Sequence, residues 1–260
     1  MIKNHVNNFV QNQLNPDLSF DNLLKNYHET GSDEVIINNA PGVWSIDKAL
    51  TKILLSIFEN SPNSSIVEFG AGYSTIVFNY ASKKNATSTS IISIEEKIDW
   101  FKVPENLTSL IDVENFNLVE SKLLFKLGYF GIYAKYQSSD LQKINSNIDI
   151  VFIDGPQRYY GREGDLDHIY SLLNEGALII LDDAERYLES CLLYKWLKVY
   201  KGLELIHFNK FLGEKGVAIL RVNKKLKRRF SIAAFSLGFF QGTKRLINTS
   251  INKSRLNKTI

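Results

Sequence analysis

The sequence predicts an α/β protein with a doubly wound, mostly parallel sheet, and three observations support this fold class. Short apolar runs of strand length alternate along the chain with longer stretches of helical spacing. Acidic residues follow several of these runs, as expected where parallel strands end at a ligand crevice. The last two runs, 203–208 and 216–222, are joined by a loop and are expected to close the sheet as an antiparallel hairpin.

The expected elements follow one another in a regular order. The strands are β-branched, apolar runs typical of strands buried on both faces, at 65–69, 90–94, 116–120, 148–153 and 177–181. The helices are expected at about 44–58, 162–174 and 185–200. Glu175 and Gly176 are expected to end the second of these helices. This order predicts a central domain over 43–222, a helical extension over 1–42 and a basic helical tail over 223–260.

The most specific signal is the glycine turn that follows the first strand. Two glycines one residue apart let the backbone turn sharply and approach a ligand closely. A dinucleotide-binding turn would have a third glycine where Thr75 stands, which weakens the interpretation as a nicotinamide-dependent enzyme. The residues expected to bind a cofactor here are Glu68, Gly70, Ala71, Gly72, Tyr73 and Ser74.

The pattern Glu-x-Gly-x-Gly-x-Ser resembles motif I of the class I S-adenosylmethionine-dependent methyltransferases. The resemblance implies a Rossmann-like sheet of seven strands whose last strand is inserted antiparallel. It also implies that the turn holds the amino acid end of S-adenosylmethionine. Glu68, a buried carboxylate that needs a cation or hydrogen-bond donors, would meet the ammonium of that cofactor.

A second acid, Glu95, stands at the tip of the second predicted strand. Two carboxylate oxygens at this position can accept both hydroxyls of a ribose, so we expect Glu95 to bind the cofactor there. The alternative is a surface carboxylate that merely ends the strand.

Three aspartates follow the next two predicted strands. Asp154 comes after 148–153, and Asp182 and Asp183 come after 177–181, so their side chains are expected in one crevice. Carboxylates so close repel one another unless one is protonated or a cation lies among them, and oxygen ligands suit Mg²⁺. Alternatively, Asp154 contacts cofactor or substrate directly, while Asp182 and Asp183 cap the following helix.

The acidic pattern resembles the metal-dependent O-methyltransferases that act on catechols, phenylpropanoid esters and antibiotic sugars. The resemblance implies that Asp154, Asp182 and Asp183 hold the metal ion, which clamps the accepting hydroxyl and lowers its pKa. Asp154 and Asp182 are accordingly the expected catalytic residues. The chain departs from the sugar-modifying branch at Pro156, where that branch tends to carry an acid serving as base, so the base is unassigned.

Other side chains give weaker signals. Arg158 and Arg162 lie in a loop over the expected substrate mouth, where they could grip an acidic sugar or phosphate, or pair with the surrounding acids. Cys191 is the only cysteine, and it is expected in a helix core. A cysteine-based zinc site and a disulfide framework are therefore excluded. The four histidines show no ligand spacing, and neither a Gly-x-Ser-x-Gly elbow nor a Walker loop occurs.

The tail has a composition of its own. Residues 224–260 contain ten Lys and Arg and no acid, whereas the preceding part of the chain is acidic. The apolar segment 230–240 has basic flanks, which suits a helix on an anionic membrane surface. Packing against the domain or a partner is the next alternative, and nucleic acid is the least favoured. Without a signal peptide or a run of about 20 apolar residues, we expect a cytoplasmic protein, peripheral on the inner membrane face.

The function expected from these observations is S-adenosylmethionine-dependent O-methylation of a sugar or glycan precursor, or of another small hydroxylated acceptor. The alternatives are an NAD-dependent oxidoreductase and a non-catalytic, methyltransferase-like adaptor at the membrane. The extension 1–42 is expected to cover the cofactor crevice or to form a homodimer contact. Beyond the strand at 116–120, no role is assigned to 103–147.

Overall fold

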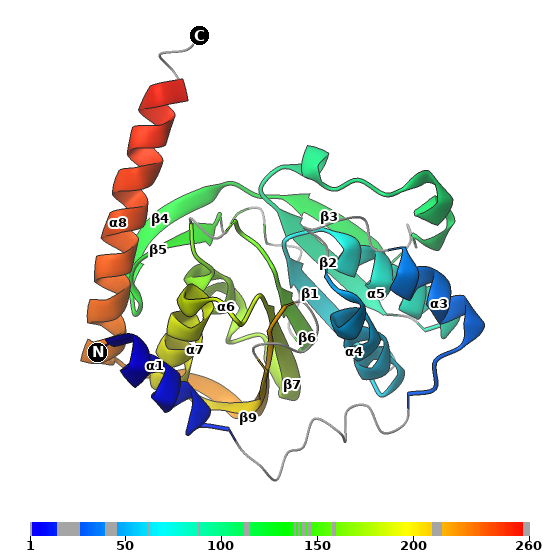
Figure 1. Ribbon diagram of the computed structural model, residues 1–260, viewed down its shortest axis with the longest axis horizontal. Coiled ribbons are helices and arrows are strands. Elements are labelled where there is room, and N and C mark those ends of the chain that lie inside the picture. Colours follow the sequence, from blue (N-terminus) through cyan, green and yellow to red (C-terminus); the bar gives the residue numbers. More distant parts are fainter. Residues whose placement is uncertain are drawn as a thin grey trace.

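The computed structural model describes residues 2–14, 27–39, 46–61, 63–87, 89–111, 115–137, 139, 141, 144, 147–157, 160–209 and 215–256 of the 260-residue chain. A central sheet separates two layers of helices (Figure 1). The strands of this sheet are β1 Ser65–Phe69, β2 Ser90–Glu95, β3 Phe116–Glu120, β6 Ile148–Ile153, β7 Leu173–Asp182, β8 Tyr200–Asn209 and β9 Val217–Arg228. The α-helices are α1 Ile2–Gln11, α3 Gly31–Asn38, α4 Lys48–Glu59, α5 Tyr73–Lys84, α6 Glu163–Ile169, α7 Tyr187–Val199 and α8 Ile232–Leu256.

The strand order is β3-β2-β1-β6-β7-β9-β8. The first five strands in this order are parallel, and β9 runs antiparallel between β7 and β8. The chain winds outward from β1 to β3 and then returns to β6 beside β1, which creates a switch point between these two strands. The predicted doubly wound sheet with an inserted antiparallel last strand is confirmed.

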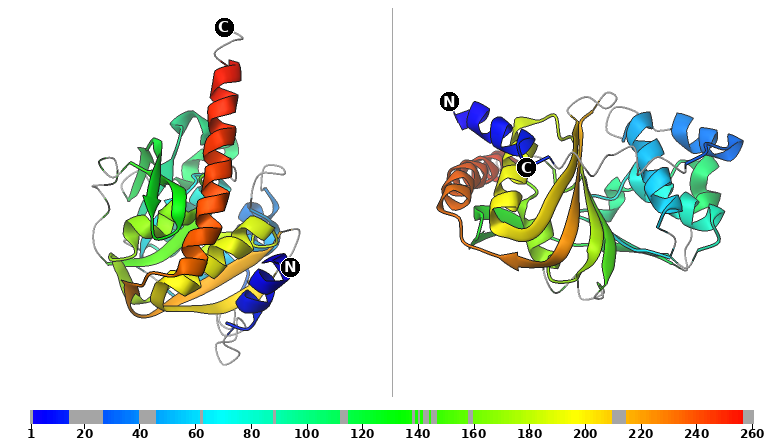
Figure 2. Two further views of the ribbon diagram at one scale, coloured as in Figure 1. Left: turned by 90° about the vertical axis from the view of Figure 1, so that its left-hand side faces the viewer. Right: turned by 90° about the horizontal axis from the view of Figure 1, so that it is seen from below.

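Helices cover both faces of the sheet, as the second view in Figure 2 shows. On one face, α4 and α5 pack against side chains such as Ile66 and Ile150. On the other face, α6 and α7 pack against Val67 and Val151, the residues that follow Ile66 and Ile150 in the two strands. Successive side chains of a strand point to opposite faces, so a sheet covered on both sides needs apolar residues at every position. This explains the continuous apolar runs from which the strands are predicted.

Several element boundaries differ from the sequence-based expectation. Helix α6 ends at Ile169, not near 174, because Leu173 already pairs with Ile148 in the sheet. Strand β7 is correspondingly longer, and Gly176 lies within it at a positive φ of 89° and does not end a helix. Helix α4 begins at Lys48, where the Asp47 carboxylate accepts a hydrogen bond from the Leu50 amide.

The first helix of the N-terminal extension packs away from the cleft described below. Helix α1 lies against α7, with the Phe9 and Tyr194 ring centroids 4.9 Å apart. The expectation that this helix covers the cofactor crevice is therefore wrong, because its buried residues Val6 and Val10 contribute to the core beside α7. Residues 15–26 of the expected helical extension lie outside the described residues. Helix α3 packs on α4, and its Ile36 carbonyl accepts a hydrogen bond from the Tyr73 hydroxyl.

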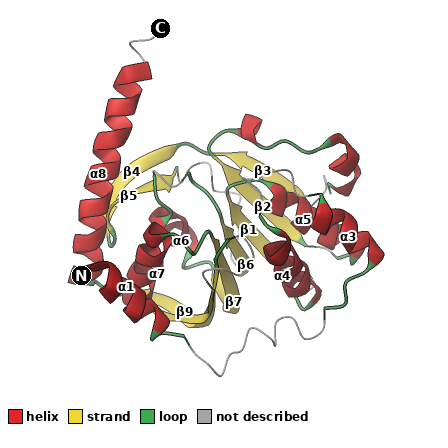
Figure 3. Cartoon of the chain, viewed as in Figure 1, coloured by secondary structure: helices red, strands yellow, loops and turns green. Residues whose placement is uncertain are grey.

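The segment for which the sequence assigns no role forms an antiparallel hairpin of β4 Leu123–Gly128 and β5 Gly131–Tyr136. Helix α8 lies along β5 and extends beyond the rest of the molecule, as Figures 1 and 3 show. Two glycines allow the close contact. A Cβ on Gly238 would lie 2.8 Å from the Phe130 carbonyl carbon, and one on Gly242 would lie 2.7 Å from the Ile132 Cβ.

Helix α8 buries one face on the hairpin and exposes the other. The large apolar side chains exposed on or beside it are Phe230, Ile232, Phe239, Phe240, Leu246 and Ile247. Within the described part of the chain, no helix has the length and apolar character of a membrane span. Packing, one of the alternatives for the tail, thus accounts for one face of α8 only.

We predict that Gly242→Ala weakens the docking of α8, because the added methyl group forces the helix and β5 apart. The free energy of unfolding should fall by about 1–3 kcal/mol, as measured by urea denaturation. Amide exchange in β5 should accelerate. The control is Ser236→Ala on the exposed face of α8, and equal stability of both variants would contradict this account of the contact.

Candidate active site

A cleft of about 1100 Å³ opens at the carboxyl ends of the parallel strands, over the switch point between β1 and β6. It is formed by the segments that follow β1, β2, β6 and β7 and by Lys215, which precedes β9. The lining residues that the sequence predicts are Gly70, Ala71, Gly72, Tyr73, Ser74, Glu95, Asp154 and Asp183. The structure thus brings most of the predicted site residues to one place.

The turns after β1 and β6 touch through two glycines. Gly70 has a positive φ of 93°, and a Cβ there would lie 2.8 Å from the Cα of Gly155. A Cβ on Gly155 would in turn lie 2.7 Å from the Cα of Gly70. The amide of Asp154 donates to the Phe69 carbonyl at 2.9 Å, which fixes the second turn against the first. The turns can therefore come this close only because neither glycine has a side chain.

Gly72 has a different role, because its missing side chain faces open space. Apart from its chain neighbours, no described residue has an atom within 4 Å of a Cβ added there. The residue caps the amino end of α5, whose first residues Tyr73 and Ser74 also line the cleft. An unfilled space beside a helix amino terminus suits the close approach of a ligand carboxylate. The residues present fit the amino acid end of the cofactor that the sequence predicts.

Glu68 lies behind this turn, completely buried, and does not line the cleft. Its carboxylate accepts hydrogen bonds from the hydroxyls of Ser74, Thr75 and Ser93 at 2.5, 2.6 and 2.5 Å. These three hydroxyls supply the hydrogen-bond donors that the buried carboxylate needs. Thr75, at the place of the third dinucleotide glycine, also accepts the Gly72 amide at 2.9 Å. Burial raises the pKa of Glu68 to about 7, against the opposing effect of the three hydroxyls.

Glu95 lines the cleft from the end of β2 and is nearly buried. The Glu96 amide donates to its Oε1 at 2.7 Å, and the Ala71 amide also bonds to this carboxylate. Glu95 therefore joins the glycine turn to the end of the neighbouring strand. Burial raises the pKa of Glu95, and these backbone donors oppose the shift.

The three aspartates converge as the sequence predicts. One carboxylate oxygen from each of Asp154, Asp182 and Asp183 lies within 4.8 Å of the others. Asp183 adopts a positive φ of 61°, which Asp tolerates better than most residues, and its amide donates to the Asp182 carboxylate at 2.8 Å. The side chains of Asp182 and Asp183 thus belong to the acidic cluster. The alternative that they cap α7 is wrong, because this helix begins after Arg186 and has no side-chain hydrogen bond at its cap.

Three cations surround this acidic cluster. Arg162 Nη2 lies 2.9 Å from Asp154 Oδ1 and 3.2 Å from Asp183 Oδ2. Arg186 Nη1 lies 2.5 Å from the same Asp183 oxygen, and Lys215 Nζ lies 3.8 Å from Asp182 Oδ2. Pairing with the surrounding acids, one of the two alternatives for Arg162, is therefore observed. Arg158 lies outside the described residues.

The cluster retains ligand capacity for a hard cation. Asp182 Oδ2 and Asp183 Oδ1 are buried and accept no hydrogen bond from any described residue. Burial, together with the charges of Asp154 and Asp183, holds the pKa of Asp182 well above its usual range. A divalent cation would favour the ionised form, and carboxylate oxygens are the ligands it prefers. The donor set therefore fits Mg²⁺.

Sequence reasoning missed Arg186 and Lys215 as parts of the site. Each lies next to an element boundary, Arg186 before α7 and Lys215 before β9, and each lines the cleft. A lysine or arginine at such a position has no distinguishing pattern in one sequence. Cys191 is buried, as predicted.

Comparisons with known proteins agree with this geometry. A family model described as a methyltransferase domain matches residues 67–184. A methyltransferase from Podospora anserina, crystallised with S-adenosylhomocysteine, is similar in fold with 15% identity and a TM-score of 0.53, over 78% of this chain and 92% of that chain. A presumed O-methyltransferase from Klebsiella pneumoniae is similar with 15% identity and a TM-score of 0.53, over 83% and 100%. No curated protein matches the chain in sequence.

We predict that Gly72→Ala lowers the affinity for S-adenosylmethionine at least about tenfold, because the methyl group occupies the space at the α5 amino terminus. The free energy of unfolding should change by less than about 1 kcal/mol. Calorimetric titration and thermal denaturation check the two effects. Gly70→Ala is the contrast, since its Cβ would meet Gly155 and should destabilise the fold. Unchanged affinity in Gly72→Ala would contradict the assignment of this space to the ligand.

We also predict that Glu68 makes the free energy of unfolding depend on pH. Its pKa is raised from 4.5 to about 7 in the folded protein, so between these values the folded state holds a proton that the unfolded state has lost. The free energy of unfolding should fall as the pH rises through this window, by about 3 kcal/mol. In Glu68→Gln this contribution is absent. Urea denaturation of both proteins from pH 4.5 to 7.5 measures the difference, and parallel pH profiles would contradict the assignment.

Proposed function

We propose that this chain is an S-adenosylmethionine-dependent methyltransferase that methylates a hydroxyl of a small acceptor, with a sugar or glycan precursor as the favoured class. The match to a methyltransferase domain model and the fold shared with a methyltransferase bound to S-adenosylhomocysteine support this proposal. When bound, S-adenosylmethionine supplies a methyl group on a positively charged sulfur. The single observation that carries the proposal is the acidic cluster of Asp154, Asp182 and Asp183 beside the cofactor cleft. A hydroxyl acceptor needs such groups, since it must lose a proton.

The cofactor-binding roles follow the lining of the cleft. Gly72, Tyr73 and Ser74 at the α5 amino terminus hold the carboxylate end, and Glu95 accepts the ribose hydroxyls. Gly70 and Ala71 shape the turn between these two regions. Glu68 acts indirectly, since its hydrogen bonds to Ser74 and Thr75 fix the turn from behind.

The catalytic roles belong to the cluster. Asp154, Asp182 and Asp183 would hold Mg²⁺, which lowers the pKa of a hydroxyl bound to it. Arg162 orients the cluster, because it donates to the Asp182 carbonyl as well as to the carboxylates of Asp154 and Asp183. Much of the rate would come from holding the acceptor oxygen in line with the methyl group.

Two alternatives make different predictions. An NAD-dependent oxidoreductase would use the same turn for a pyrophosphate, but Thr75 fills the position of the third glycine with hydrogen bonds to Glu68 and Gly72. A non-catalytic adaptor would not need the two buried aspartate oxygens without hydrogen-bond partners. Both observations favour methyl transfer.

We predict that the wild-type protein binds S-adenosylmethionine and Mg²⁺. Asp182→Asn should lower the affinity for Mg²⁺ at least about tenfold and leave the affinity for the cofactor unchanged. Glu95→Ala should weaken the cofactor in a comparable way. Calorimetric titration measures both, and Glu34→Gln, an exposed acid on α3, is the control. Transfer of labelled methyl groups is then assayed on monosaccharides, sugar phosphates and catechol.

Each outcome of these assays decides between proposals. Failure of S-adenosylmethionine to bind would contradict methyl transfer, and binding of NADH in its place would favour the oxidoreductase. Methylation of catechol without methylation of any sugar would contradict the glycan preference. Transfer that does not depend on Mg²⁺ would contradict the metal site.

We also propose that the exposed face of α8 binds an anionic membrane surface, which would place the enzyme at the inner face of the membrane. The supporting observation is the row of exposed apolar side chains, among them Ile232 and Phe240, each 75% exposed. Lys224, Lys225 and Lys227 are exposed at the strand end that leads into this helix. Apolar insertion and attraction to anionic headgroups act together in such a helix.

We predict that Phe240→Ser lowers binding to phosphatidylglycerol vesicles about tenfold, because burial of the ring contributes about 1.5–3 kcal/mol. Vesicle sedimentation measures the binding, with phosphatidylcholine vesicles as the lipid control and Ser236→Ala as the protein control. If the wild-type protein binds both kinds of vesicle equally, or if added salt leaves its binding unchanged, the electrostatic part of the proposal is contradicted.

A further inference from the structure

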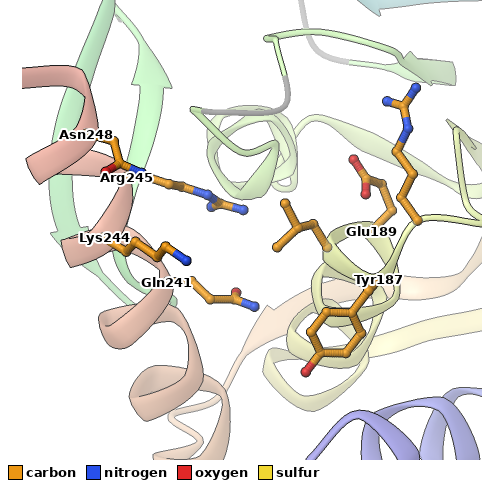
Figure 4. Close-up of a pocket in the computed structure, with 8 residues that line it drawn as sticks. Tyr187, Glu189, Gln241, Lys244, Arg245 and Asn248 are labelled. Atoms are coloured by element: carbon orange, nitrogen blue, oxygen red, sulfur yellow. The ribbon is translucent and has the colours of Figure 1, made fainter. Parts of the chain in front are cut away.

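A second pocket lies between the amino end of α7 and the middle of α8, outside the cofactor cleft. Its volume is about 430 Å³. Figure 4 shows Gln241, Lys244, Arg245 and Asn248 reaching from α8 toward Tyr187 and Glu189 of α7. No role for this pocket follows from the cofactor site, because the two share only Arg186.

The polar lining of the pocket favours an anion. Arg186 to Glu189 are the cap and the first three residues of α7, a helix of 13 residues with no side-chain hydrogen bond at its cap, and the Glu189 carboxylate accepts from its own amide. The positive end of the helix dipole lies at this end of α7. Lys244 adds a full charge, and no described residue pairs with it. Gln241 and Asn248 add amide donors from the same helix. Cations, amides and a helix amino terminus together form a site for phosphate oxygens.

One acid lines the pocket as well. Glu189 is only 3% exposed, and its Oε2 has no hydrogen-bond partner among the described residues. Burial raises the pKa of Glu189 to about 7, although Arg162 and Arg186 oppose this shift. A phosphate alone would leave this oxygen unsatisfied, whereas a ligand that also carries hydroxyl groups can donate to it.

The wall formed by α8 is held in place by a buried ion cluster. Lys195 on α7 and Arg245 on α8 both pair with Glu163 at the start of α6, and Arg245 Nη1 lies 2.8 Å from both Glu163 oxygens. Lys195 also donates to Gln241 Oε1 at 2.7 Å. These contacts hold α8 beside α7 along this wall of the pocket, whereas Lys244 and Asn248 on the same wall are exposed.

Arg186 connects the pocket to the proposed chemistry. It lines both cavities, and its Nη1 lies 2.5 Å from Asp183 Oδ2 in the acidic cluster. The pocket and the cleft therefore meet at this side chain. We propose that this pocket binds the phosphate group of the acceptor, a proposal that rests on the proposed methyl transfer. The acceptor is then a hydroxylated phosphate ester, such as a sugar phosphate.

The proposal is tested by binding and not by turnover. Wild type, Lys244→Gln and the control Lys227→Gln are titrated calorimetrically with glucose 1-phosphate and with inorganic phosphate. The two variants lose the same charge, but Lys227 is exposed on β9, outside the pocket. Lys244→Gln should weaken binding of glucose 1-phosphate at least about tenfold, and Lys227→Gln should change it less than twofold. Thermal denaturation verifies that all three proteins are equally folded.

Several results would overturn the proposal: no binding to wild type, equal weakening in both variants, or inorganic phosphate bound as tightly as the ester. Phosphatidylglycerol vesicles give a further arm, since a Lys244 effect seen with vesicles alone would assign the residue to lipid headgroups. Titration with S-adenosylmethionine separates this proposal from the proposed function. If the protein binds the cofactor but not the ester, only the proposal of an acceptor pocket is contradicted. If it binds the ester but not the cofactor, only the proposed methyl transfer is contradicted.

Discussion

The contact between Gly70 and Gly155 is the constraint on which the site depends. It joins the ends of β1 and β6, the two strands on either side of the switch point, at a distance that leaves no room for a Cβ on either residue. The glycine turn after β1 and the turn that carries Asp154 are therefore one backbone unit. Hydrogen bonds then extend this unit outward, through Glu68 behind the glycine turn and Glu95 at its side.

Much of this arrangement could be predicted from the sequence, because it follows from strand order and from residues at strand ends. Apolar runs marked the parallel strands, and the polar residues after them had to meet at one edge of the sheet. Asp154, Asp182 and Asp183 converge for this reason. For Glu68, the sequence predicted the burial of the carboxylate but not the side chains that bond to it. Its sequence position indicated a buried carboxylate in need of partners, but only the folded chain shows that three hydroxyls supply them.

The parts that could not be predicted depend on contacts between distant segments. The hairpin of β4 and β5 buries aromatic residues such as Phe130 and Tyr133, and β5 packs against α6 and against α8, a helix about a hundred residues later in the chain. Gly238 and Gly242 look unfavourable in a helix until β5 is placed against them. Helix α6 ends early because Leu173 pairs in the sheet with Ile148, which local propensity does not reveal. In each case tertiary packing overrides the local pattern.

Arg162 and Glu163 are consecutive residues whose charges belong to two different ion-pair networks. The guanidinium pairs with the acidic cluster, and the carboxylate pairs with Lys195 and Arg245. One peptide bond at the amino end of α6 thus joins the residue that contacts the cluster to the residue on which α8 docks. A backbone shift at this single point would displace both networks, so the seat of the tail and the acidic edge of the cleft share one anchor.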